Sequence, residues 1–287
     1  MRVYREFDRA ALDAQYNIRA RVPDTEDHIR RWFDKSERAR ATLPCRLDVP
    51  YGPSAAEKLD IFPAGPRAPV LVFIHGGYWR AMDKDHHRFP ALGAVPQGVA
   101  CVTVNYALAP LVRMTEIVRQ VRAALAWVYR NAGTFGGDPA RVHVCGHSAG
   151  GHLTAMALAT DWPAFAGDLP HDMLKGGMPV SGIYDLEPIR LCYLNDDLKL
   201  DAAEVAQFSP ARHPPRGPSW MVLALGGLEA AEFHRQQAEL AAAWRASGLA
   251  VATADQPQDH HFNVIDRLSE ADDPLTRALL SRIKEGA

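Results

Sequence analysis

The sequence predicts a doubly wound α/β fold, in which a mostly parallel central sheet is covered by helices on both faces. From residue 46 onward, apolar runs of strand length alternate with helix-like segments, which is typical of such a sheet. One of these strands leads directly into Gly146-His147-Ser148-Ala149-Gly150, a GxSxG pentapeptide. The chain has 287 residues, of which 47% are hydrophobic and 23% charged. That is enough for one large core, so we expect a single domain over residues 1–287.

The first half of the chain contains the elements that lead to the pentapeptide. Residues 1–45 are charged and helix-prone, and we expect them to form a small helical cap segment. Asp24-Thr25-Glu26-Asp27 offers a start signal for a helix through Trp32 and Phe33. We then expect a hairpin formed by 46–51 and 58–62, strands over 70–75 and 99–105, and a helix over 115–131.

The second half continues the alternation. A strand over 142–146 enters the pentapeptide, and a helix follows Ser148. Between Leu186 and Pro218 the periodicity lapses into a proline-rich stretch, so we expect a cap excursion over the active-site face at 186–218. The remaining predicted elements are strands over 178–184, 220–226 and 250–254, a helix over 232–247 and two closing helices.

The composition argues against several classes of partner. A net charge of −2 and a pI near 6.6 give no electrostatic reason to expect nucleic acid or an anionic membrane. The N-terminus is charged where a signal peptide is apolar, and no apolar run reaches about 18 residues, so we expect a cytoplasmic protein. A small-molecule substrate is expected, and a homodimer is left open. Reduced thiols are expected for Cys45, Cys101, Cys145 and Cys192.

Ser148 is the predicted nucleophile. A strand before it and a helix after it place it at a sharp turn with its hydroxyl exposed. Glycines two positions to either side would let the strand and the helix pass without a Cβ clash. Because GxSxG alone is a weak pattern, this interpretation depends on its context. The alternative is a glycine-rich turn with an incidental serine.

A second glycine pair follows an earlier strand, in His75-Gly76-Gly77-Tyr78-Trp79. Glycines let a backbone turn its N–H groups toward a bound carbonyl oxygen, so we expect Gly76, Gly77 and Ala149 to form an oxyanion hole. Tyr78 and Trp79 are expected to line the substrate pocket, with packing in the core as the alternative.

A serine nucleophile also needs a histidine base, and the chain contains 12 histidines. In this fold the acid follows a late strand and the base lies beyond the last one, which leaves His260 and His261. His86-His87 does not indicate a metal site, because adjacent helix residues do not face one another and no further ligand follows at a suitable spacing. Structural roles are expected for His75, His143 and His152.

The acid is sought in the loop after strand 220–226, which contains two glutamates and no aspartate. Glu229 lies nearer to the strand end and is the predicted acid. Glu232 stands where the next helix begins, and its charge would favour that helix N-terminus. Asp255 and Asp259 follow the next strand, which is late for this role.

Several motifs together resemble the kynurenine formamidase (arylformamidase) branch of the α/β-hydrolase superfamily. They lie at 75–79, 146–152, 181–186, 232–236 and 261–262, and residues 12–16 are similar as well, so the likeness covers nearly the whole chain. The motifs at 75–77 and 106–110 are also similar to the hormone-sensitive-lipase-like esterases, and are therefore less specific.

The resemblance implies a catalytic triad. In this branch the base stands directly before a phenylalanine, which implies His261, with His260 as a solvated neighbour. The acid stands three residues before the glutamate of Glu-Phe-His-Arg-Gln, which implies Glu229. The branch usually has aspartate at that position, but glutamate can serve as the triad acid in this fold. No cofactor and no metal are implied, because the metal-dependent bacterial formamidases have a different fold and a histidine-rich motif that is absent here.

The predicted function is that of a serine hydrolase that cleaves an aryl formamide, such as N-formylkynurenine, through an acyl enzyme. The alternative is a short-chain carboxylesterase. A third hypothesis, from another class, is an inactive hydrolase fold that serves as a small-molecule receptor, although the complete set of predicted catalytic groups argues against it. The sequence does not identify the pocket walls that the cap contributes.

Overall fold

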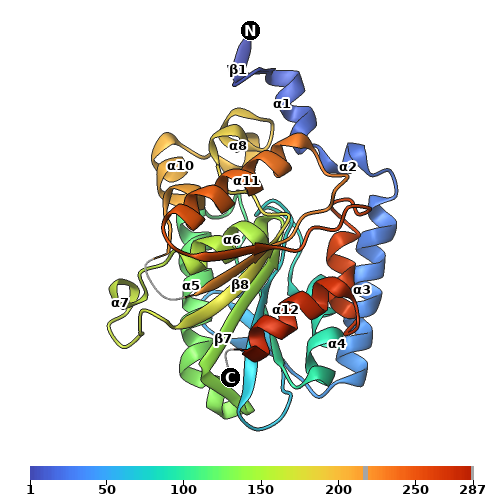
Figure 1. The fold of residues 1–287 in the computed structure, drawn as a ribbon, viewed down its shortest axis with the longest axis vertical. Coiled ribbons are helices and arrows are strands. Elements are labelled where there is room, and N and C mark those ends of the chain that lie inside the picture. The colour runs from blue at the N-terminus through green and yellow to red at the C-terminus, as the bar shows by residue number, and fades with distance from the viewer. Residues whose placement is uncertain (216–218, 286–287) are drawn as a thin grey trace.

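The computed structural model describes residues 1–215 and 219–285, built around an eight-stranded sheet (Figure 1). Its strand order is β10-β9-β8-β7-β5-β6-β4-β3. Neighbours from β10 to β6 are parallel, whereas β4 pairs antiparallel with both β6 and β3. The strands are β3 (Arg46–Pro50), β4 (Lys58–Phe62), β5 (Ala68–Ile74), β6 (Ala100–Val104), β7 (Gly137–His147), β8 (Leu174–Val180), β9 (Trp220–Leu223) and β10 (Ala250–Thr253).

Helices cover both faces of this sheet, which explains why its central strands are apolar along their whole length. In β5, Val70, Val72 and Ile74 face the core under α5, α6 and α11, whereas Leu71 and Phe73 face the core under α3, α4 and α12. The predicted doubly wound arrangement is confirmed. These helices are α3 (Thr25–Thr42), α4 (Pro90–Ala94), α5 (Met114–Asn131), α6 (Ala149–Leu158), α11 (Ala231–Ala246) and α12 (Pro274–Glu285).

Two predicted strands end earlier than the apolar pattern indicated. β8 ends at Val180 and β9 at Leu223, three or four residues before the predicted ends. Ser181 has a φ of 51°, which turns the chain out of the sheet. The N–H groups of Tyr184 and Asp185 then donate to the Gln236 side chain of α11 instead of to a neighbouring strand. The carboxyl ends of both strands therefore open into loops at one edge of the sheet.

The N-terminal segment runs along the carboxyl-terminal edge of the sheet before α3 descends its side (Figure 1). It contains a small hairpin that the sequence did not indicate, β1 (Arg2–Tyr4) with β2 (Phe7–Asp8), followed by α1 (Arg9–Tyr16) and α2 (Ile18–Arg21). Asp13 accepts the backbone N–H of Tyr193 at 2.8 Å. The motif at 12–16 thus ties the N-terminal segment to the predicted excursion.

The excursion after Leu186 folds into short helices near α11. Trp244 of α11 donates its indole N–H to the carbonyl of Pro210 at 3.0 Å, which fixes the end of the excursion. Pro218, the last residue of the predicted range, lies outside the described residues. The excursion contains α8 (Glu187–Leu191), α9 (Asn195–Leu198), α10 (Ala202–Phe208) and η4 (Pro210–Arg212).

The remaining elements are short, apart from the closing helix already named. They are η1 (Lys84–His87), η2 (Val95–Gln97), η3 (Ala132–Phe135), α7 (Trp162–Phe165) and η5 (Val264–Ser269). All four cysteines are free, as predicted. In the described parts of the chain, none of the helices has the length and hydropathy needed to cross a bilayer.

Candidate active site

Ser148 lies between β7 and α6 with a φ of 58° and a ψ of −117°. A non-glycine residue rarely adopts a positive φ, and such strain persists only where the surroundings enforce it. Here the N–H of Ser148 donates to the carbonyl of Val180 at 2.9 Å, and its own carbonyl accepts the N–H of His152 at 3.0 Å. The serine therefore occupies the sharp strand-to-helix turn that its context predicted.

The glycines of the pentapeptide allow α6 to lie directly against the sheet. A Cβ on Gly150 would lie 2.0 Å from the carbonyl oxygen of Ile74, and a Cβ on Gly146 would lie 2.3 Å from the carbonyl oxygen of Gly150. Both distances are far below van der Waals contact, so a larger residue would push α6 away from β5 and β7. The predicted reason for these two glycines is confirmed.

His261 and Glu229 come from the loops after β10 and β9, and their side chains form a buried pair. His261 Nδ1 lies 2.6 Å from Glu229 Oε2, so the ring donates its Nδ1–H to the carboxylate. The two side chains are only 3% and 1% exposed. The opposite ring nitrogen, Nε2, is buried and has no hydrogen-bond partner in the described part of the chain. The pair thus fixes the ring and leaves Nε2 available.

The second oxygen of Glu229 is held as firmly as the first. Oε1 accepts the hydroxyl of Ser181 at 2.5 Å and the backbone N–H of Gly226 at 2.9 Å. Sequence reasoning did not single out Ser181 as a member of the site. The signal was present, because Ser181 opens the 181–186 motif that contributed to the family resemblance.

The two aspartates considered as alternative acids are engaged elsewhere. Asp259 forms an ion pair with Arg267 and accepts the side-chain amide of Asn263 at 3.2 Å. Asp255 accepts the side-chain amide of Gln237 at 2.8 Å. Neither contacts His261 in the hydrogen bonds of the described residues, so the geometry favours Glu229.

Glu232 differs from its prediction as a simple helix N-terminal charge. It is 2% exposed, accepts the hydroxyl of Tyr16 at 3.0 Å and forms an ion pair with Arg235 at 2.7 Å. Tyr16 ends α1, so Glu232 connects the N-terminal segment to α11. Its role in the structure is therefore an anchor for the cap.

The loop after β5 brings the predicted oxyanion glycines next to Ser148. A Cβ on Gly76 would lie 3.2 Å from the Cβ of Ser148, and Gly77 has a φ of +104°, which favours glycine. His75 Nδ1 lies 2.8 Å from the Gly76 carbonyl oxygen and donates to it. In a trans peptide the N–H points opposite to the C=O, so this bond turns the Gly77 N–H away from His75. Ala149 opens α6, and its N–H is among the unsatisfied groups of a helix start.

Tyr78 and Trp79 have different positions, although both were predicted to line the pocket. Tyr78 lies on the cavity wall and donates its hydroxyl to the carbonyl of Tyr16 at 2.8 Å. Trp79 is 0% exposed and donates its indole N–H to His152 Nδ1 at 3.2 Å. The prediction for Trp79 is wrong: its side chain packs in the core, where its hydrogen bond to His152 braces the helix behind Ser148.

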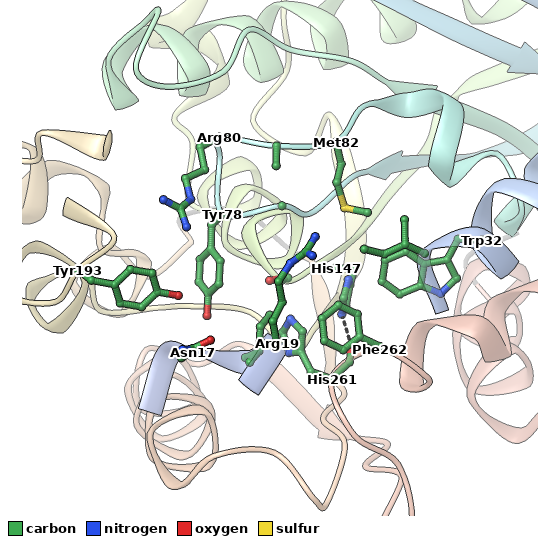
Figure 2. A pocket seen from close by; sticks show the side chains of 15 residues that line it. Asn17, Arg19, Trp32, Tyr78, Arg80, Met82, His147, Tyr193, His261 and Phe262 are labelled. Atoms are coloured by element: carbon green, nitrogen blue, oxygen red, sulfur yellow. Dashed lines mark hydrogen bonds between the residues drawn. The ribbon is translucent and has the colours of Figure 1, made fainter. Parts of the chain in front are cut away.

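A cavity of about 120 Å³ opens over Ser148 and His261 (Figure 2). The N-terminal segment supplies one wall, and the excursion supplies Tyr193. Both parts of the predicted cap therefore shape the pocket. The lining residues are Asn17, Ile18, Arg19, Ile29, Trp32, Gly77, Tyr78, Arg80, Ala81, Met82, His147, Ser148, Tyr193, His261 and Phe262.

Several buried histidines are held neutral around the site. Burial lowers the pKa of His75 and of His152 to about 4, and it lowers the pKa of His147 well below its ordinary value. His147 donates its Nε2–H to the backbone carbonyl of His261 at 2.8 Å (dashed in Figure 2). These rings support the backbone of the site, in agreement with the structural roles predicted for His75 and His152.

His260, expected as a solvated loop residue, lies in a loop and is half-buried. Its Nδ1 accepts the N–H groups of Phe262 and Asn263 at 3.1 and 3.3 Å, and its ring packs edge-on against His28. Asp24, His28 and His260 could hold a metal ion by proximity, since their donor atoms lie within 4.8 Å of one another. However, Nδ1 of His28 also accepts a donor, from Arg31 at 3.2 Å. Both neutral rings then carry a proton on Nε2, which suits hydrogen bonds better than metal ligation.

Known proteins resemble this chain over nearly its whole length. Kynurenine formamidase of Danio rerio is 34% identical over 264 residues, covering 89% of this chain and 88% of that protein. Kynurenine formamidase of Salmo salar is 34% identical over 285 residues, covering 96% and 95%. The chain belongs to the kynurenine formamidase family. The resemblance inferred from its motifs is confirmed.

Other similarities agree with this family of hydrolases. A family model described as BD-FAE matches residues 59–177. A crystal structure from Silicibacter sp. TM1040, to which a thioesterase activity has been attributed, is 31% identical, with a TM-score of 0.83 and coverage of 94% and 98%. An esterase of Pyrobaculum calidifontis, 16% identical with a TM-score of 0.72 and coverage of 93% and 96%, shares the fold. The α/β-hydrolase fold and the hydrolase class are therefore confirmed, while the individual site residues stay predictions.

Proposed function

We propose that this protein hydrolyses an aryl formamide, such as N-formylkynurenine, through a formyl-enzyme intermediate. The observation that carries the proposal is the buried pair of Glu229 and His261, which opens with Ser148 onto one cavity. The relatives that match nearly the whole chain are named kynurenine formamidases, which supports this substrate over other acyl donors.

In the first step, Ser148 Oγ attacks the formyl carbon while His261 Nε2 takes the hydroxyl proton. Glu229 keeps the second ring proton on Nδ1 and stabilises the imidazolium. The N–H groups of Gly76, Gly77 and Ala149 would hold the oxyanion of the tetrahedral intermediate. His261 then gives its proton to the leaving arylamine nitrogen as the C–N bond breaks.

In the second step, water replaces the amine. His261 takes a proton from the water, whose oxygen attacks the formyl ester, and the proton returns to Ser148 Oγ as formate leaves. The departing aryl group suits the apolar side chains that line the cavity, including Trp32, Met82 and Phe262. The cytoplasmic location and the homodimer considered from the sequence stay predictions.

The proposal is tested by comparing kcat/KM for N-formylkynurenine and p-nitrophenyl acetate, with Ser148→Ala as the control. We expect the formamide to be the better substrate and the variant to lose both activities. If the formamide is no better than the ester, the short-chain carboxylesterase alternative replaces the proposal. That alternative has its own support, because the esterase LipQ of Mycobacterium tuberculosis is 35% identical over 48% of the chain. If neither substrate reacts, the receptor hypothesis gains.

A further inference from the structure

The charged groups on the cavity wall are all of one sign. Among the described residues that line the cavity, Arg19 and Arg80 carry full charges, and no lining residue is a carboxylate. The surrounding wall is largely aromatic and aliphatic. Guanidinium groups in such a setting favour a ligand that carries a negative charge and an apolar body.

The guanidinium of Arg80 already has partners within the protein. It forms an ion pair with Asp197 of α9, and its guanidinium carbon lies 5.7 Å from the ring centroid of Tyr193. These contacts fix the arginine between the loop after β5 and the excursion. An acidic partner also neutralises much of its charge. Arg80 therefore acts mainly as part of the wall.

Arg19 is held much more loosely and reaches into the cavity. Figure 2 shows its side chain rising from the α2 segment between Tyr78 and Phe262. Its partner is Glu26, and the two side chains are 60% and 74% exposed. Exposed pairs of this kind contribute little stability, so an incoming anion can take the place of Glu26. Arg19 therefore offers the cavity a guanidinium that a substrate can recruit.

We propose that Arg19 is the specificity residue that binds a carboxylate on the substrate, at the end remote from the formamide. The preferred substrates are then aryl formamides whose aryl group carries a chain with a carboxylate. This inference rests on the proposed function, since it assigns the recognition of a group that does not react. The fork of the guanidinium can donate two hydrogen bonds to a carboxylate, which lysine cannot reproduce.

The test compares substrates that differ only in this charge. N-formylkynurenine is assayed against its carboxamide, in which the carboxylate is replaced by a neutral amide of the same size. We expect wild-type kcat/KM to favour the substrate with the carboxylate by about 10- to 100-fold, the range for a hydrogen bond to a charged group. R19Q should bring this ratio close to one, mainly through KM, and R19K should keep part of it.

Arg30 supplies the matched control. It is an exposed arginine on α3 that pairs with the exposed Asp27 at 2.7 Å, and it does not line the cavity. R30Q should leave the ratio unchanged. The inference is overturned if R19Q keeps the wild-type ratio, or if it lowers both substrates equally. It is also overturned if R80Q, and not R19Q, removes the preference.

A second substrate pair separates this inference from the proposed function. 4-Acetoxybenzoate and 4-acetoxybenzamide carry the same change of charge on an aryl ester. If the wild-type enzyme cleaves these esters with an Arg19-dependent preference for the anion but cleaves neither formamide, the formamidase proposal fails and the anion site stands. If it cleaves the formamides and shows no such preference in either substrate pair, the assignment of Arg19 fails and the formamidase proposal stands.

Discussion

Glu229 lies in the loop between β9 and α11 and Glu232 in the first turn of α11, three residues later, and both are almost completely buried. Their partners differ. Glu229 accepts hydrogen bonds from His261, Ser181 and Gly226, all on the loops at the carboxyl ends of the strands. Glu232 binds Tyr16 and Arg235, which join the N-terminal segment to α11. Two buried glutamates thus belong to two regions, the strand-end loops and the cap, and they differ in their contacts.

The difference between these regions concerns how rigidly each is held. The strand-end loops are fixed by short hydrogen bonds to backbone groups and by strained residues such as Ser148 and Ser181. The cap is fixed by hydrogen bonds from side chains, among them those from the hydroxyls of Tyr78 and Tyr193 to the backbone carbonyl of Tyr16. We therefore expect changes in the loops to alter kcat and changes in the cap to alter stability or KM.

Glu229→Gln should have the largest effect of the changes considered. A neutral amide no longer fixes the tautomer of His261 or stabilises its imidazolium, and the corresponding Asp-to-Asn change in a serine protease costs about 10⁴ in kcat. We expect kcat to fall at least 100-fold with little change in thermal stability. Steady-state kinetics and a melting curve measure both.

Asp255→Asn is the matched control for Glu229→Gln, because Asp255 lies at the end of the neighbouring strand and contacts Gln237. It should keep near wild-type kcat. A fully active Glu229→Gln together with an inactive Asp255→Asn or Asp259→Asn would show that the acid comes from after β10. Glu229→Asp shortens the arm by one methylene, so we expect partial activity from it.

Glu232→Gln should act on the other region. The amide can still accept the Tyr16 hydroxyl, but Arg235 loses a buried charged partner and keeps Glu239, an exposed one. We expect a loss of about 1–3 kcal/mol in the free energy of unfolding, as for other hydrogen bonds to charged groups. The kcat should change less than threefold. Chemical denaturation followed by kinetics of the folded variant tests this, and a kcat as low as that of Glu229→Gln would contradict the division between the two regions.

Much of the fold could be predicted because burial on both faces leaves a plain signal. The strands β4, β5 and β6 were located within two residues at each end, since their apolar runs stop where the chain reaches solvent or glycine. β8 and β9 were predicted too long, because residues after their ends stay buried although the regular ladder stops: Tyr184 pairs with the Gln236 side chain, and Ala224 and Gly226 form only isolated bridges. Apolar composition reports burial and cannot report which backbone partner a residue has.

The site was predictable where the chemistry restricts residue type. Glycines crowded by backbone and a serine before a helix leave few choices, whereas the choice of His261 over His260 depended on the family resemblance. Arg19, Ser181 and the misplaced Trp79 show the limit. Each depends on a side-chain direction set by tertiary contacts, and Trp79 points to the core, where it donates to His152.

Ser181→Ala should have a smaller effect on the strand-end region. It removes one of two hydrogen bonds to Glu229 Oε1 and leaves the bond to His261 in place. We expect kcat to fall about tenfold, because a bond to a charged acceptor contributes about 1.5 kcal/mol or more. The acidic limb of the kcat/KM profile should also move, which a purely structural loss would not produce. The control is Ser36→Ala: Ser36 is another buried serine, its hydroxyl accepts the N–H of Arg88, and its loss should leave kcat unchanged.

The smallest expected effect concerns the pH dependence of the unfolding free energy, through the buried His143 of β7. Burial lowers the pKa of His143 to about 3, against about 6.5 in the unfolded chain. Below pH 6.5 the unfolded chain therefore binds one proton more than the folded protein, and stability is lost as the pH falls toward 3. This histidine alone should lower the free energy of unfolding by about 1 kcal/mol between pH 6 and pH 5.

His143→Gln tests this contribution of His143. The comparison uses the change in unfolding free energy between the two pH values, so a general loss of stability in the variant does not affect it. Its unfolding free energy should fall about 1 kcal/mol less between pH 6 and pH 5 than that of the wild type. His171→Gln replaces an exposed ring on a surface loop and serves as the control. Urea titrations at the two pH values measure the difference. Equal pH responses in His143→Gln and the wild type would mean that the buried ring of His143 takes up its proton in the folded state, through an opening of β7 beside Trp220.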